Sequence, residues 1–159
     1  PYFDAYGTPR HEQAYEAATY LFAMGETEAA RKRLGNHPAE LRAQLLREPT
    51  NARIWSILGA MEVILGHKEE ALRCDARALE LIPESRDALD GVTNAAFRAA
   101  DLDWLGEKDQ ALAEYTRLLR LPCLYLTNVH VMKRRHSTLR GDPRFEALLN
   151  DPKNNQPLF

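Results

Sequence analysis

Three glycines, each followed five residues later by an alanine, constrain this chain more than any other feature. An amphipathic run, with apolar residues spaced by three and four, precedes each glycine, and another such run follows it. Glycine permits the sharp turn that two closely packed helices require. The pairs are Gly25 and Ala30, Gly66 and Ala71, and Gly106 and Ala111, so the glycines are 41 and 40 residues apart. This spacing predicts three helical hairpins.

The middle hairpin has the clearest pattern. A stripe of apolar residues runs from Trp55 to Leu65 and ends at Gly66, and a second helical run from Glu69 to Ile82 stops before Pro83. Each helix would be roughly 20 Å long. We therefore predict an all-α chain in which residues 1–159 form a single domain. Its hairpins are expected over 11–35, 52–83 and 86–122.

Two segments fall outside the repeat. Residues 36–50 contain a further apolar stripe, Leu41, Leu45 and Leu46, behind Asn36 and Pro38, which suit a helix start, so we expect an extra short helix there. Residues 123–159 are expected to form a C-terminal cap. Its stretch 123–132 could be a strand, although a short helix from Thr127 fits better because no partner strand exists. Asp142 and Pro143 predict the start of a last helix, and the residues from Lys153 onward are expected to fray.

Composition excludes several classes of protein. The chain has 159 residues, of which 45% are hydrophobic, with a formal charge of −2, so it can bury a core without disulfides. It lacks the basic excess of a nucleic-acid binder, and no run of 18 apolar residues could cross a membrane. The two cysteines form no CxxC pair, which favours a reducing, cytoplasmic setting.

The charge is unevenly distributed. Residues 121–159 carry +3 and the remainder carries −5. The basic cluster from Lys133 to His136 could bind phosphate or an acidic partner, or the basic tail could pack beside the acidic hairpins. Four such residues fall short of a nucleic-acid surface.

No residue pattern indicates catalysis or a bound cofactor. Cys123, His130 and His136 could be aligned as metal ligands, but their spacings match no common zinc site. Cys74 lies in an apolar helical run, where an inert buried thiol is expected, and no serine stands in a nucleophile elbow. We therefore expect no enzyme activity, no metal and no cofactor.

The middle hairpin resembles the tetratricopeptide repeat. The signature of that family is matched at seven positions: Trp55, Leu58, Gly59, Gly66, Ala71, Ala78 and Pro83. Glu62 and Asp75 replace its tyrosine and phenylalanine, so this repeat either packs less tightly or buries something else there. The third hairpin keeps Gly106, Ala111 and Tyr115, and the first is the weakest match. HEAT-type repeats share the longer period and are the alternative. The resemblance implies a right-handed α-α superhelix of hairpins.

The segment from Thr138 to Leu149 is similar to the closing segment of tetratricopeptide regions at the C-terminus of bacterial multidomain signalling proteins with cyclase-like, kinase-like or transcription-regulator architectures. That resemblance implies a scaffold or regulatory role. The chain also begins at Pro1 without a methionine, so we expect it to be part of a longer protein.

By the same resemblance, the first helix of each hairpin lines a concave groove that binds a peptide or partner domain. Arg53, Asn94 and Arg98 would supply polar anchors, whereas Asp90 stands where a clamp for a C-terminal carboxylate would need lysine, so no such clamp is expected. The groove residues are Tyr15, Thr19, Phe22, Arg53, Ser56, Ala60, Val63, Asp87, Asp90, Asn94 and Arg98.

The large aromatic residues have a structural interpretation first. Trp55, Tyr115 and Phe145 are expected to be buried between helices. Trp104, beside Asp101, Asp103 and Glu107, could either anchor a partner or pack as a lid over the hairpin. The sequence thus predicts a protein–protein interaction module. The alternatives are a self-association module that dimerises through its first or last helix and, with less support, a groove for a small ligand.

Overall fold

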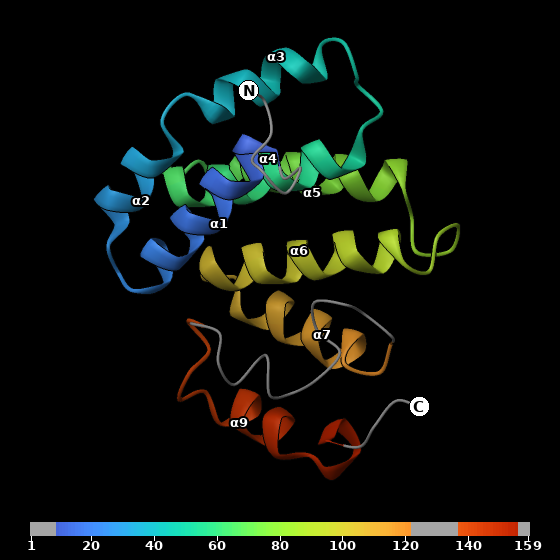
Figure 1. The fold of residues 1–159 in the computed structure, drawn as a ribbon. Helices are drawn as coiled ribbons and strands as arrows, with labels where there is room; N and C mark the ends of the chain where they lie inside the picture. Colours follow the sequence, from blue (N-terminus) through green and yellow to red (C-terminus); the bar gives the residue numbers. More distant parts are fainter. Residues whose placement is uncertain (1–8, 122–136, 156–159) are drawn as a thin grey trace. The chain divides into compact units, whose positions relative to one another are not determined.

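A computed structural model describes residues 9–121 and 137–155 (Figure 1). Within these residues the chain is helical and contains no β-strand, as the sequence predicts. It divides into two compact units, Pro1–Ala78 and Leu79–Phe159, which we describe one at a time.

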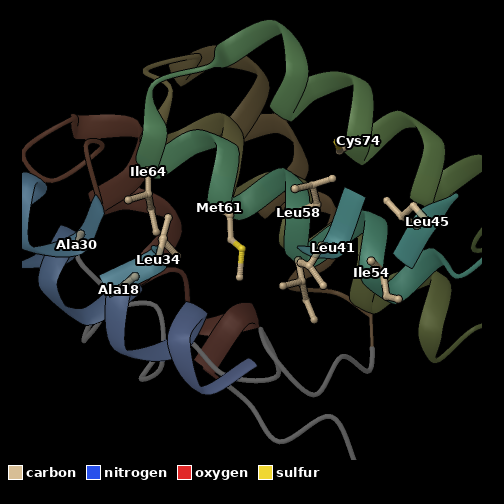
Figure 2. Close-up of a cluster of buried hydrophobic side chains, with 11 residues drawn as sticks. Ala18, Ala30, Leu34, Leu41, Leu45, Ile54, Leu58, Met61, Ile64 and Cys74 are labelled. Atoms are coloured by element: carbon tan, nitrogen blue, oxygen red, sulfur yellow. The ribbon is translucent and has the colours of Figure 1, made fainter. Parts of the chain in front are cut away.

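The described residues of the first unit form the helices α1 (Arg10–Ala23), α2 (Thr27–Leu34), α3 (His37–Leu45), α4 (Ala52–Leu65) and α5 (Lys68–Leu81), the last of which ends in the second unit. The extra helix predicted within 36–50 is confirmed as α3. Helices α1 and α2 pair as a hairpin, and α3 packs against α4. Leucines 34, 41 and 45 join Ile54, Leu58 and Met61 in one buried cluster, which Figure 2 shows.

Helices α4 and α5 approach each other closely at Gly59. A β-carbon at this position would lie 2.8 Å from an Asp75 carboxylate oxygen and 3.3 Å from both the Ala71 carbonyl oxygen and the Cys74 β-carbon. Since real β-carbons do not come within 3.0 Å of such atoms, only glycine fits without a shift of its neighbours.

The second unit contains α6 (Asp90–Trp104), α7 (Lys108–Leu118), α9 (Pro143–Asn150) and the 3-10 turn η1 (Pro152–Asn155). Asp142 caps α9, as predicted, by accepting a hydrogen bond from the Arg144 backbone nitrogen. Lys153 and Asn154 are not frayed, because they belong to η1, where the Asn154 amide donates to the Leu148 carbonyl at 3.0 Å. The expected helix from Thr127 lies outside the described residues.

The three predicted hairpin turns share one geometry. Gly25, Gly66 and Gly106 have φ of 83°, 86° and 79°, values in the left-handed region that side chains disfavour. In each turn the backbone nitrogen of the next residue donates to a carbonyl five residues earlier, at 2.9 Å. These bonds join Glu26 to Leu21, His67 to Glu62, and Glu107 to Leu102. Each turn is therefore the same Schellman motif, which satisfies carbonyls that the helix end leaves free.

The alanines of the repeat explain how the second helix of each hairpin packs closely against the first. Ala30, Ala71 and Ala111 are each 0% exposed, and each donates its backbone nitrogen to the carbonyl of the residue that follows the glycine. A methyl group fills the space between the helices without separating them. The Gly–Ala repeat thus specifies the hairpins through one turn and one contact.

A buried aspartate fastens the C-terminal segment to the second hairpin. The Asp103 side chain accepts hydrogen bonds from the Thr138 backbone nitrogen at 2.9 Å, the Thr138 hydroxyl at 2.7 Å and the Tyr115 hydroxyl at 3.3 Å. The Tyr115 and Phe145 rings lie 6.2 Å apart, and both are buried, as predicted. Trp55 is instead only partly buried, and its indole nitrogen donates to the Pro49 carbonyl at 2.9 Å in an exposed position.

We predict that Gly106→Ala lowers the free energy of unfolding by about 1–2 kcal/mol, the cost of a side chain in a left-handed conformation. The space around Gly106 is open, and a β-carbon added there would have no atom within 4 Å, so the effect should come from φ alone. Gly106→Asn, which tolerates this conformation, should lose less. Equal stability of all three proteins in urea unfolding would contradict this explanation.

We also predict that Asp103→Ala lowers the free energy of unfolding by about 2–3 kcal/mol, because it removes the acceptor of the buried Tyr115 hydroxyl and of the Thr138 backbone nitrogen. Asp109→Ala is the matched control. That aspartate pairs with Arg144 at 2.7 Å but is largely exposed, so its loss should cost below about 1 kcal/mol. Chemical unfolding of both variants tests this, and equal losses would refute the role given to Asp103.

Candidate functional site

The predicted groove residues of α1 lie on one face of that helix. Tyr15, Thr19 and Phe22 are all partly exposed. The Tyr15 and Phe22 rings also pack against the buried cluster of the first unit. Each of these two rings therefore has one part in contact with the core and another part exposed to solvent.

Arg53 is the accessible groove residue of α4. Its side chain is half exposed, and its guanidinium donates through Nε and Nη2 to the two carboxylate oxygens of Glu12 on α1, at 2.9 and 3.2 Å. Two parallel bonds hold the planar group in a fixed orientation. Beside it, His11 is buried, and burial is the first cause that lowers its pKa, so its neutral form is favoured.

Ser56, Ala60 and Val63 are buried and offer no surface to a partner, contrary to the sequence-based expectation. The reason is the environment of α4, in which nearly every residue from Ala52 to Ile64 is buried. A helix that is covered all round has no open face for its small residues to line. Within that stretch, Arg53 is exposed and Trp55 is partly buried.

The predicted residues of α6 lie in the second unit. Asp90 is exposed and Arg98 is partly exposed, whereas Asn94 is buried. Asp87 has a local role, because its carboxylate accepts hydrogen bonds from the backbone nitrogens of Leu89 and Asp90 at 2.9 and 2.8 Å. These bonds lower the pKa of Asp87 and secure the turn that leads into α6.

Trp104 is partly buried, and the two acids that precede it do not form an exposed acidic rim. Asp101 and Asp103 are both buried, and Asp103 holds Thr138. The surroundings of Trp104 are therefore less acidic at the surface than the sequence suggests.

Sequence reasoning missed a second polar site, which is centred on Glu62 of α4. The Glu62 side chain is 0% exposed, yet each carboxylate oxygen accepts from a basic side chain. Arg42 of α3 donates through Nη2 to Oε1 at 2.5 Å, and His67, after the Gly66 turn, donates through Nδ1 to Oε2 at 2.8 Å. A buried carboxylate is tolerated when such partners compensate its lost hydration.

The two partners of Glu62 reach the surface. The Arg42 and His67 side chains are 45% and 60% exposed. On neighbouring α5, Glu70 accepts from Arg73 at 2.6 Å, and this bond, with further contributions from Arg42 and His67, lowers the pKa of Glu70. Arg73 also lies over the Trp55 ring, 5.4 Å from its centroid. A charged surface patch therefore covers one buried acid.

One sequence signal did point to Glu62. It replaces the tyrosine of the repeat signature, and it is the single acid in the apolar run from Ala52 to Leu65. Its partner Arg42 could not be identified, because it lies 20 residues away on a helix outside the repeat.

The environment of Cys74 does not favour the thiolate form that a nucleophile requires. The thiol is buried, and burial raises its pKa to about 12, as expected for an inert cysteine. Within 9–121 and 137–155, no three His, Cys, Asp or Glu side chains are grouped to hold a metal ion. The ligand set of Cys123, His130 and His136 and the basic cluster at Lys133 lie outside these ranges.

None of the helices in the described part of the chain is both long and apolar enough to span a membrane. Comparison with known proteins adds no assignment: no protein-family model, no curated protein and no solved structure matches the chain.

Proposed function

We propose that this chain is a protein–protein interaction module built from tetratricopeptide-like hairpins, and that it serves as a scaffold or regulatory part of a bacterial cytoplasmic signalling protein. The observation that carries this proposal is the hairpin turn repeated at Gly25, Gly66 and Gly106 with matching φ and hydrogen bonds. Repeated hairpins commonly stack into a superhelix with a concave face that receives a peptide.

Arg53 is the best-supported polar anchor for such a partner. Its guanidinium is half exposed and already oriented by Glu12, so little further ordering is needed when it binds. A planar guanidinium recognises carboxylates through paired hydrogen bonds. An acidic side chain of a partner would share or replace the Glu12 contact, and the α1 stripe with Tyr15 and Phe22 would supply apolar area.

The proposal includes no catalytic residue. The Cys74 thiol is buried with a raised pKa, and Glu62 is fully engaged by Arg42 and His67. A docking role requires only the exposed anchor and a rigid scaffold, which the hairpins supply.

Self-association is the second candidate, and one observation favours it. Tyr20 on α1 and Met24, the residue that directly follows α1, are 74% and 60% exposed. Aromatic and methionine side chains are enriched at protein interfaces, so the occupant that we propose for that face is a second copy of this chain.

We predict that Arg53→Gln reduces the capture of bound proteins at least ten-fold when the full chain is used as bait, because a neutral amide cannot form the charged fork. Arg47→Gln is the matched control, since Arg47 is an exposed arginine in the same unit. Circular dichroism should show that both variants remain folded. An unchanged set of captured proteins with Arg53→Gln would remove Arg53 from the interface.

For the second candidate, we predict that the mass measured by solution scattering increases with concentration for the wild-type chain. The double substitution Tyr20→Ser with Met24→Ser should abolish this increase. Leu46→Ser is the control, because Leu46 is 86% exposed but lies at the end of α3. A constant monomer mass over the whole concentration range would reject self-association.

A further inference from the structure

Helix α3 differs from the other helices of the first unit. It lies outside the Gly–Ala repeat. Like α2, it is short, with nine residues, and its N-cap residue Asn36 makes no side-chain capping bond. Exposed residues flank it on both sides, at 35–36 and 46–50. A helix this short is not stable by itself in water, so its contacts with the rest of the unit hold it in place.

Helix α3 contacts α4 and α1, and its buried residues are Pro38, Leu41 and Leu45. Leu41 and Leu45, one helical turn apart, are buried in the cluster that includes Ile54 and Leu58 of α4 (Figure 2). Between them, Arg42 donates to the buried carboxylate of Glu62. The pattern is that of an amphipathic helix seated on an apolar surface with one charged anchor.

The second basic partner of Glu62 lowers the cost of separating α3 from α4. Removing one member of a buried ion pair is normally costly, because an uncompensated charge remains in the core. Here His67 belongs to the turn between α4 and α5 and stays in place. Glu62 would therefore keep a hydrogen-bonded, basic partner after Arg42 departs, and the surface beneath α3 stays polar at one defined point.

We propose that α3 is a displaceable segment that covers a second docking surface on α4. The partner is a protein helix with two leucines four residues apart and an arginine directly after the first, because the surface already binds this pattern. This inference rests on the proposed interaction function and specifies a partner class for a surface other than the one around Arg53. When the partner helix replaces α3, its arginine would take the place of Arg42 as the donor to the Glu62 carboxylate.

The test uses a fluorescent peptide that spans residues 36–48, added to the full chain and followed by fluorescence anisotropy. The Arg42→Gln chain holds its own α3 less firmly and should bind this peptide at least ten-fold more tightly than the wild-type chain does. Arg47→Gln is the matched control and should resemble the wild type. A peptide with both leucines replaced by alanine should not bind.

A second peptide, with glutamine in place of arginine at position 42, isolates the charged anchor. It should bind the Arg42→Gln chain at least ten-fold more weakly than the arginine peptide does. Adding Glu62→Gln to that chain should remove the difference between the two peptides. A difference that persists without the Glu62 carboxylate would show that arginine is recognised elsewhere and would overturn the assigned anchor.

Hydrogen exchange tests displacement without any peptide. In the wild-type chain the backbone amides of α3 should exchange faster than those of α4, and Arg42→Gln should accelerate α3 exchange about ten-fold while leaving α4 unchanged. Equal exchange rates in both helices, or no peptide binding to the Arg42→Gln chain at millimolar concentration, would overturn the proposal. Loss of capture by Arg53→Gln concerns the other surface, so the two proposals can fail separately.

Discussion

The structure depends first on a backbone conformation that only glycine adopts at low cost. At Gly25, Gly66 and Gly106 the chain turns through positive φ, and the residue after each glycine hydrogen-bonds back to the preceding helix. This motif both ends one helix and orients the next. The buried alanine five residues later then lets the two helices approach closely. One local rule, used three times, therefore specifies hairpins whose flanking sequences differ widely.

Helix α4 is buried on nearly all sides, which restricts the residues that it can carry. Almost every side chain from Ala52 to Ile64 is buried, so the helix has no hydrated face on which an acid could remain exposed. Glu62 is tolerated there because two basic side chains reach it from different elements. The extra helix α3 is thus more than a covering for apolar residues, since it supplies one of the two groups that make the buried charge acceptable.

Local features were predictable and long-range polar contacts were not. The glycine turns, the extra helix and the Asp142 cap follow from residue types within a few positions of one another, where propensity and capping decide the outcome. The burial of Ser56, Ala60 and Val63 was missed because small residues suit a groove and a crowded core equally well. The Arg42–Glu62 and Thr138–Asp103 contacts span 20 and 35 residues, and nothing local in the sequence encodes such pairings.

Two of the buried acids, Glu62 and Asp103, share a physical role. Glu62 lies four residues before Gly66, and Asp103 lies three residues before Gly106, so both occupy the last turn of the first helix of a hairpin. A negative charge there opposes the helix dipole and must find donors elsewhere. Glu62 obtains them from α3 and His67, and Asp103 from Thr138 and Tyr115. In both units the carboxylate sets the register in which a segment outside the repeat packs, because hydrogen bonds impose a register that apolar contacts alone do not.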